Sequence, residues 1–386
     1  MADALAGIRV LDFTQAWAGP LCTQTLADFG ADVVKVESET RPDVSRMMGP
    51  YPEAADVDLS GYFLELNRNK RSVALNLRLP EEVEIARRLA EQADVVVENF
   101  APGVLDRLGL GYDVLKETRP DLVMLSISGF GATGPDRAAV AFGQQIEAES
   151  GLMSLTGYGD GVPMKPGVSY PDPVAGVAGV GAVMAALLHR DRTGEGQWID
   201  LSMLEITAAL LVQPLMEYAR TGVSPAATGN ASALWSPHGI YPATGEDRWI
   251  AIECDDEEQW RALASRAGLG WEDDPRFASN AERLAYRGEL DAALGAWTAG
   301  QDRDAIADEL QAAGVPAAAV ADVADLHADP HLRARGWWQT VEHARAGRLD
   351  LQGPPARLTA TPARVRLAPP LLGEHTEAVK AELARA

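Results

Sequence analysis

Apolar runs and amphipathic segments alternate along the first third of the chain. Ile8–Phe13 and Val33–Glu37 are short runs rich in β-branched residues, which predicts two strands. Between them a helical pattern begins at Pro20 and ends at Gly30, a residue type favoured just beyond a helix. A strand, a helix and a strand within about 30 residues form a βαβ unit, so we expect a parallel sheet with right-handed crossovers.

The same alternation continues through the next segments. Ser72–Leu77, Asp94–Glu98 and Leu122–Ser128 each predict a further strand, and the last two are near-continuous apolar runs. Such runs are typical of strands that helices cover on both faces. Pro80–Gln92 predicts a helix, because proline stands at its start, acidic residues occupy the first turn and arginines follow.

The pattern changes after Gly151. Val174–His189 is rich in alanine and glycine, and its apolar run of about 15 residues is too short to span a bilayer, so we expect a buried core helix. Thr193–Glu205 predicts a turn, a strand and the start of a helix that runs to about Arg220. Residues 222–245 are rich in Gly, Pro, Ala, Ser and Thr, which predicts a crossing linker.

A second, more polar unit follows the linker. It spans residues 246–325, and a tail starts near residue 330. The elements predicted there are one strand (Trp249–Glu253), two helices (Glu257–Ala267 and Glu282–Trp297), a strand-like segment (Trp337–Val341) and a terminal helix.

Composition narrows the class of protein. A length of 386 residues predicts two or three domains, and 47% hydrophobic with 23% charged residues is typical of a globular chain. The 34 basic and 56 acidic residues leave a net charge of −22, which argues against a nucleic-acid or anionic-membrane partner. Cys22 and Cys254 are too few for a disulfide framework, and the N-terminus shows no signal-peptide core. We therefore expect buried free thiols in a cytoplasmic protein.

Several common catalytic and binding motifs are absent from the sequence. The first turn, Thr14–Pro20, lacks the G-x-G-x-x-G pattern that lets the backbone approach a dinucleotide pyrophosphate. No phosphate loop appears, and Ser126–Gly131 has the wrong spacing for a G-x-S-x-G nucleophile elbow. His327 and His331 are separated by Pro330, so we expect no metal site.

Asp172 stands out among the acidic residues. It lies between Pro171 and Pro173, which stiffen its backbone, and it directly precedes an apolar helix whose first amides favour an anion. Local sequence leaves two interpretations open. Asp172 caps the helix, which is the more frequent role of Asp at such a position, or it is a nucleophilic carboxylate held rigidly at the helix start.

Five segments occur in order along nearly the whole chain. They are LAGIRVLDFTQAWAGPLCTQTLADFGADVVKVE (5–37), NRNKRSVALNLR (67–78), DVVVENFAPGVLDRLGLGY (94–112), GVSYPDPVAGVAGVGAVMAALLHRDRTGEGQWIDLSMLE (167–205) and PLLGEHTEAV (370–379). Together they resemble the class III CoA-transferases, the family of formyl-CoA:oxalate and crotonobetainyl-CoA:carnitine CoA-transferases.

The resemblance implies an α/β fold. It pairs a Rossmann-like parallel-sheet large domain with a smaller α+β domain, in an interlocked homodimer. The N-terminal part of the large domain would cover residues 1–221, the linker and small domain residues 222–329, and the C-terminal return to the large domain residues 330–386.

The resemblance also implies a covalent mechanism in which Asp172 is the nucleophile. Its carboxylate attacks an acyl-CoA thioester to give a mixed anhydride, and the CoA thiolate then forms an aspartyl-CoA thioester and frees the donor acid. A small carboxylic acid acceptor repeats these steps in reverse. Acyl-CoA is thus a substrate, and no metal takes part.

The CoA site implied by the resemblance draws on three segments. Its residues are Trp17, Ala18, Lys70, Arg71, Leu75, Asn76, Leu77, Arg78, Asn99, Phe100 and Arg107. Lys70, Arg71 and Arg107 are the natural partners of the nucleotide phosphates. Trp17 stands where the family often has Gln beside the nucleophile, which predicts a more apolar pocket.

The predicted substrate pocket departs from the family pattern. Where relatives carry Tyr or His followed by an acid, this chain has Phe142 and a glycine. Glu147 and Glu149 are candidate replacements, although an exposed helix face is the commoner place for such acids. The related α-methylacyl-CoA racemases use a His/Asp pair, and a phenylalanine cannot move a proton, which disfavours a racemase or epimerase. His238 keeps that alternative open, and a non-catalytic CoA-binding protein is a third hypothesis. The other predicted pocket residues are Trp235 and Tyr241.

Overall fold

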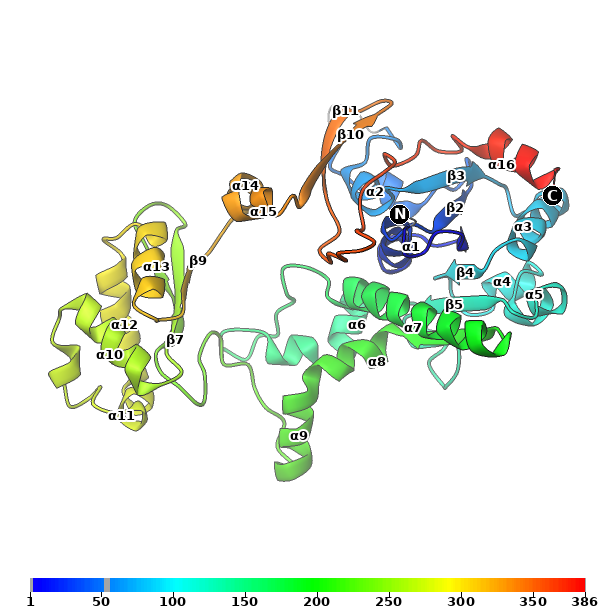
Figure 1. Cartoon of the computed structure of the whole chain (residues 1–386). Coiled ribbons are helices and arrows are strands. Elements are labelled where there is room, and N and C mark those ends of the chain that lie inside the picture. The colour runs from blue at the N-terminus through cyan, green and yellow to red at the C-terminus, as the bar shows by residue number, and fades with distance from the viewer. Residues whose placement is uncertain (1–2, 52–55, 386) are drawn as a thin grey trace. The chain divides into compact units, whose positions relative to one another are not determined.

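The computed structural model describes residues 3–51 and 56–385, which form two compact units (Figure 1). The first unit contains the chain up to residue 153, residues 165–225 and the chain from residue 331. The second contains residues 154–164 and 226–330. The chain therefore leaves the first unit and returns to it twice, whereas the sequence predicts a single interruption.

A six-stranded sheet forms the centre of the first unit. Its strand order is β3-β2-β1-β4-β5-β6, and all neighbouring strands are parallel. The strands are β1 (Arg9–Asp12), β2 (Asp32–Glu37), β3 (Lys70–Ala74), β4 (Val95–Glu98), β5 (Val123–Ser128) and β6 (Gln197–Ser202). The strand order reverses between β1 and β4, which is where such sheets form ligand sites at their carboxyl edge. The predicted α/β class with a parallel sheet is confirmed.

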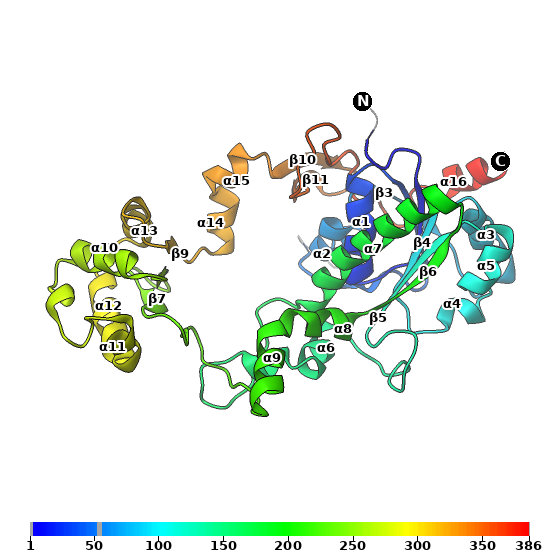
Figure 2. The same ribbon diagram turned by 60° about the horizontal axis from the view of Figure 1, so that its bottom comes forward.

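Helices cover both faces of this sheet (Figures 1 and 2). α1 and α7 pack over Val10, Val95 and Leu125, and α3 and α16 pack over Leu11 and Val96. Neighbouring residues of one strand thus face opposite layers, which explains the near-continuous apolar runs. The helices are α1 (Ala18–Asp28), α2 (Gly61–Leu66), α3 (Pro80–Glu91), α4 (Val104–Arg107), α5 (Tyr112–Thr118), α6 (Gly143–Glu149), α7 (Pro171–Thr193), α8 (Met203–Ala208), α9 (Val212–Thr221) and α16 (Thr376–Leu383).

α7 is longer than its sequence pattern predicts, with 23 residues in place of Val174–His189. Among the described residues it is the one helix long and apolar enough to cross a membrane by length and composition. One side of α7 lies close against α1, because a Cβ atom on Gly176 would lie 2.7 Å from the carbonyl oxygen of Ala18. Such close backbone packing is typical of a core helix. Val177 and Leu188 on α7 are more than half exposed in the single chain, so the prediction of a buried helix holds for one side of it.

Two further elements of the first unit differ from their predicted bounds. β3 begins two residues before the predicted Ser72–Leu77 and ends three residues before it, because Lys70 already pairs with Val33 in the parallel ladder. The helix predicted to continue to Arg220 is divided into α8 and α9 by a 3₁₀ turn. Both cysteines are free and buried, as predicted.

The second unit contains a three-stranded antiparallel sheet, so the prediction of a single strand is wrong. Its strands are β7 (His238–Pro242), β8 (Trp249–Glu253) and β9 (Ala317–Ala319), in that order across the sheet. β7 ends in proline and β9 consists of alanines, and neither residue favours strands. The helices are α10 (Glu257–Ala267), α11 (Asn280–Ala285), α12 (Arg287–Thr298), α13 (Arg303–Ala312) and α14 (Val323–Ala328). The predicted helix Glu282–Trp297 is therefore two helices.

The C-terminal segment completes the first unit. After α15 (Pro330–Ala334), β10 (Trp338–His343) and β11 (Gly347–Gln352) form an antiparallel hairpin. α16 then packs beside β3, where the amide of Ala74 donates a hydrogen bond to Thr376 Oγ1 at 2.9 Å. Val379 and Leu383 of α16 are buried in the core, so the last residues belong to the same domain as the first.

Candidate active site

Segments from distant parts of the first unit meet around Asp172. α7 precedes β6 and runs back across the sheet, so its first turn lies at the carboxyl edge where β1 and β4 end. The backbone amide of Ala18, the first residue of α1, donates a hydrogen bond to the Asp172 carboxylate. Ser169 Oγ donates a second hydrogen bond to Asp172 Oδ2 at 3.1 Å.

Asp172 is not the residue that caps α7. The N-cap residue is Tyr170, and it makes no side-chain capping hydrogen bond. Asp172 lies inside the first turn, and its side chain is hydrogen-bonded across to α1. The capping interpretation of Asp172 is therefore wrong.

The environment of Asp172 combines burial with hydrogen bonds. Burial raises the pKa of its carboxyl group above the ordinary value of 3.8, and hydrogen bonds from Ser169 and Ala18 offset part of that shift. The Glu147 carboxylate raises the pKa further. A carboxylate that is poorly hydrated yet held in one orientation is well suited to attack a carbonyl carbon.

Two predicted pocket residues lie on α6 and directly before it. Glu147 is 1% exposed, and its Oε1 accepts a hydrogen bond from the Tyr170 amide at 3.1 Å. Phe142 is exposed, and a Cβ atom on the following Gly143 would lie 2.2 Å from Asp172 Oδ2. A side chain at position 143 would therefore displace the carboxylate, which explains why this chain has glycine there.

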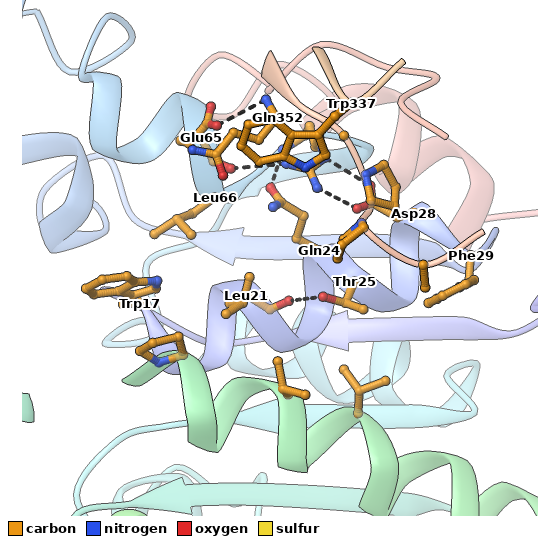
Figure 3. Close-up of a pocket in the computed structure, with 18 of the residues that line it drawn as sticks. Trp17, Leu21, Gln24, Thr25, Asp28, Phe29, Glu65, Leu66, Trp337 and Gln352 are labelled. Atoms are coloured by element: carbon orange, nitrogen blue, oxygen red, sulfur yellow. Dashed lines mark hydrogen bonds and ion pairs between the residues drawn. The ribbon is translucent and has the colours of Figure 1, made fainter. Parts of the chain in front are cut away.

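A cavity of about 900 Å³ opens next to this site in the first unit. Figure 3 shows Trp17, directly before α1, and Leu21 on α1 at one side of the cavity, with Trp337 across from them. Pro173, the residue after Asp172, also lines it. The walls near Trp17 are apolar, as the sequence predicts, and an apolar wall limits the water that could hydrolyse an activated acyl group.

Tyr62 on α2 is a site residue that the sequence did not indicate. Its ring contacts Trp17 edge-to-face, with 5.7 Å between ring centroids, and it lines the same cavity. Burial raises the pKa of Tyr62 to about 12, and the Asp172 and Asp43 carboxylates add to the effect. The phenol therefore stays protonated near the nucleophile. No motif around Tyr62 could have identified it.

Comparison with known proteins decides the family. Residues 5–376 match the family model of CoA-transferase family III. The chain belongs to this family. It is 36% identical to succinate–glutarate CoA-transferase of Agrobacterium fabrum over 98% of this chain and 95% of that protein. It is 35% identical to succinyl-CoA–D-citramalate CoA-transferase of Chloroflexus aurantiacus, over 98% and 94% of the two chains.

Solved structures agree with this assignment. A CAIB/BAIF family protein from Brucella suis superposes with a TM-score of 0.90 at 37% identity, covering 99% of this chain and 100% of that one. The predicted resemblance is confirmed. This family III enzyme transfers CoA between an acyl-CoA and a carboxylic acid.

Lys70 and Arg71, which the resemblance implies as phosphate partners, are engaged by other groups of the protein. Lys70 is 0% exposed, and its ammonium donates to Asp12 Oδ2 at 3.1 Å, to the Pro20 carbonyl at 3.0 Å and to Asn67 Oδ1 at 2.9 Å. All three of its N–H donors are used inside the protein. Arg71 pairs with two carboxylates, those of Asp32 and Glu382. Neither residue is therefore part of the CoA site that we propose below.

The other predicted CoA residues lie at the carboxyl edge of the sheet. Leu75 is buried in the core, while Asn76, Leu77 and Arg78 follow it in the loop after β3. Arg107 on α4 is exposed and forms no ion pair with the residues that the structure describes. Phe100 follows β4, half-buried.

Three predicted pocket residues belong to the second unit. Tyr241 is 3% exposed in its core, and its hydroxyl donates to Asp291 Oδ1 at 2.8 Å, so it is a core residue rather than a pocket residue. His238 Nδ1 lies 2.7 Å from the Asn230 carbonyl oxygen, and it lines a cavity of about 560 Å³ within that unit. Trp235 is half-buried. Within residues 3–51 and 56–385, no group of three His, Cys, Asp or Glu side chains is placed to hold a metal ion.

Proposed function

We propose that this enzyme transfers CoA through a covalent aspartyl-CoA thioester on Asp172. The observation that supports this most strongly is the carboxylate itself. It is largely buried, hydrogen-bonded to Ser169 and to the first amide of α1, and its neighbours in space and sequence line the cavity. The pKa of this carboxyl group is raised by burial, which favours nucleophilic attack once it is ionised.

The reaction proceeds in two matched halves. An Asp172 oxygen attacks the thioester carbon of the donor, the C–S bond breaks, and CoA leaves as the thiolate with a mixed anhydride on the enzyme. The thiolate then attacks the Asp172 carbonyl carbon, the anhydride C–O bond breaks, and the donor acid departs. The acceptor carboxylate reverses both steps, so no proton, water or external oxidant is consumed.

We infer that the acids exchanged are short dicarboxylates. The related transferases carry succinate, glutarate, D-citramalate, mesaconate or L-malate in their names. Several of these names contain succinyl-CoA, which we take as the donor. The sequence pattern at position 142 argues against a racemase, since Phe142 cannot transfer a proton.

The proposed CoA site lies along the carboxyl edge of the sheet. Trp17 and Ala18 border Asp172, and Asn76–Arg78 and Phe100 follow neighbouring parallel strands. Of Lys70, Arg71 and Arg107, Arg107 alone forms no ion pair within the part of the chain that the structure describes, so we propose it as the partner of a nucleotide phosphate.

We also propose a homodimer in the cytoplasm. The exposed apolar side chains of α9 support the dimer, because Val212, Leu215, Met216 and Tyr218 are each more than half exposed in the single chain. The two free, buried cysteines suit a reducing compartment.

Trapping of the thioester tests the proposed chemistry. Incubation with succinyl-CoA followed by hydroxylamine should inactivate the enzyme, whereas hydroxylamine alone should have no effect. Asp172→Ala should lose CoA transfer, and Asp172→Asn should lose it with the fold intact by circular dichroism. Substantial exchange by Asp172→Ala across a panel of dicarboxylates would overturn the assignment.

A further inference from the structure

The loop between β1 and α1 is held in an unusual backbone conformation beside the nucleophile. Ala16 has φ +64°, in the left-handed region that alanine rarely occupies. Ala18, two residues later, provides the amide that hydrogen-bonds Asp172. A conformation that is unfavourable for the residue itself has to be held by its surroundings.

Asn99 holds the loop from one side. Its Oδ1 accepts a hydrogen bond from the Gln15 amide at 2.8 Å, and its Nδ2 donates to the Gln15 carbonyl at 2.8 Å. Asn99 directly follows β4, and the Phe13 amide already bonds to the Val97 carbonyl at 2.9 Å. The Asn99 side chain therefore continues the β1–β4 pairing beyond the end of the sheet, where the backbones diverge.

Asp43 and Lys35 hold the loop from the other side. Asp43 Oδ1 accepts from the Ala16 amide at 2.9 Å, and Lys35 Nζ donates to the Thr14 carbonyl at 2.6 Å. The two side chains form an ion pair at 2.8 Å, and both are fully buried. The backbone groups from the Thr14 carbonyl to the Ala16 amide are thus each bonded to a fixed partner.

We propose that Asn99 and Asp43 are positioning residues for CoA transfer, which fix the Ala16 turn and thereby aim the Ala18 amide at the carboxylate of Asp172. This inference rests on the proposed role of Asp172 as nucleophile. It replaces the direct CoA contact that the family resemblance implies for Asn99, because both ends of the Asn99 amide are already bonded to Gln15.

The chemistry gives this amide a defined task. When the CoA thiolate attacks the Asp172 carbonyl carbon, the oxyanion that forms is an oxygen of Asp172 itself. An N–H group that already bonds this carboxylate is placed to stabilise the new charge. The hydrogen bonds from Asn99 and Asp43 to this loop therefore act on the barrier of the chemical step, while the affinity for CoA depends on other residues.

A division of effects between kcat and KM tests the proposal. Asn99→Ala should lower kcat by about 10-fold or more, a loss typical of a misplaced oxyanion donor, and change the KM for acyl-CoA by less than about 3-fold. The double variant Ala16→Gly/Asn99→Ala should regain part of the lost kcat relative to Asn99→Ala. Glycine adopts a positive φ without the steric strain that alanine has there, so the turn at residue 16 should persist without the Asn99 hydrogen bonds.

Asn69→Ala is the matched control. Asn69 is another buried asparagine that binds backbone, accepting from the Arg366 amide at 2.6 Å and the Leu367 amide at 2.8 Å. Its Nδ2 also donates to Asp28 Oδ1 at 2.7 Å, at the opposite end of α1 from Ala18. Removal of the Asn69 side chain should lower the melting temperature and leave kcat within about 2-fold, since it does not touch the loop before α1.

Two results would overturn the inference. One is a raised KM with unchanged kcat in Asn99→Ala, which would make Asn99 a CoA contact. The other is an equal loss of kcat in Asn99→Ala and in the double variant. Neither affects the role of Asp172, because hydroxylamine trapping after succinyl-CoA is measured separately in the wild-type enzyme.

Discussion

At the scale of single residues, the charge of one buried carboxylate affects the ionisation of another. The Glu147 carboxylate raises the pKa of Asp172, and it also accepts a hydrogen bond from the Tyr170 amide. The nucleophile must be ionised to attack, so activity falls as pH drops through its pKa, which lies above 3.8.

Glu147→Gln should therefore move the acid limb of the kcat/KM–pH profile to lower pH. The amide keeps an oxygen acceptor for Tyr170 and removes the negative charge that opposes ionisation of Asp172. The profile is measured with saturating acceptor against Glu149→Gln, a change at an exposed acid on the same helix. An unchanged acid limb in Glu147→Gln would contradict the electrostatic coupling.

A second buried acid predicts a pH effect on stability. Burial raises the pKa of Glu98, at the end of β4, from 4.5 to about 7. Between these values the folded protein keeps a proton that the unfolded chain has released, so the free energy of unfolding decreases as pH rises from 4.5 to about 7.

Glu98→Gln should remove this effect. The variant should be more stable than the wild type at pH 8, by at most on the order of 3 kcal/mol, and equally stable near pH 4, where the wild-type carboxyl is already protonated. Urea denaturation at both pH values measures the difference. A variant that is less stable at pH 8 would show that Glu98 is stabilised as the carboxylate.

The sequence predicts the candidate nucleophile better than it predicts which side chains contact one another. Asp172 could be identified because its flanking prolines and the family segments are local signals. The burial of Lys70 depends on Asp12, which is distant in sequence. The hydrogen bond between Gln15 and Asn99 likewise joins residues 84 positions apart. Such pairings arise from the sheet order, which no motif encodes.

At the scale of elements, the contact between α1 and α7 sets the geometry of the site. A Cβ atom on Gly176 would lie 2.7 Å from the Ala18 carbonyl oxygen, and nothing lies within 4 Å of a Cβ atom on Gly181 in the same helix. α1 provides the Ala18 amide and α7 provides Asp172, so any separation of these helices loosens their hydrogen bond.

Gly176→Ala should lower stability by about 1–3 kcal/mol through overpacking and reduce kcat. Gly181→Ala is the control, and it should raise stability by about 0.5–1 kcal/mol because alanine favours helix. Thermal unfolding and steady-state kinetics of both variants measure these effects. Equal behaviour of the two alanine variants would show that α1 and α7 are not closely packed.

Elements with a clear periodicity of apolar residues could be predicted from the sequence, and elements that depend on tertiary contacts could not. β8 and α10 have the bounds that their patterns predict, Trp249–Glu253 and Glu257–Ala267. β7 and β9 were missed because their residues disfavour strands, and they pair only through β8.

At the scale of the whole molecule, the exposed face of α9 bears on the assembly. Leu215 is 54% exposed, and a dimer interface would bury it. Leu215→Glu should shift the mass measured by light scattering from twice 41.2 kDa toward 41.2 kDa. Val114→Glu, at an exposed apolar residue of α5, should leave the mass unchanged. A wild-type enzyme with a mass of 41.2 kDa would contradict the proposed dimer.

The net charge of −22 has little influence on CoA binding if phosphate recognition is local. Arg107→Ala should raise the KM for acyl-CoA by about 10-fold or more and leave kcat nearly unchanged, because one charge-assisted phosphate contact is lost. Lys70→Met, in contrast, should mainly destabilise the fold, since it leaves Asp12 buried with one partner fewer.

The central claim is that Asp172 carries the acyl and CoA groups covalently, and oxygen tracing tests it most directly. In this mechanism one oxygen of the acceptor carboxylate passes to Asp172 and then to the released donor acid. After a single turnover with ¹⁸O-labelled succinate as acceptor, the peptide containing Asp172 should gain one ¹⁸O atom by mass spectrometry. Rapid CoA transfer that leaves Asp172 unlabelled would contradict the covalent mechanism.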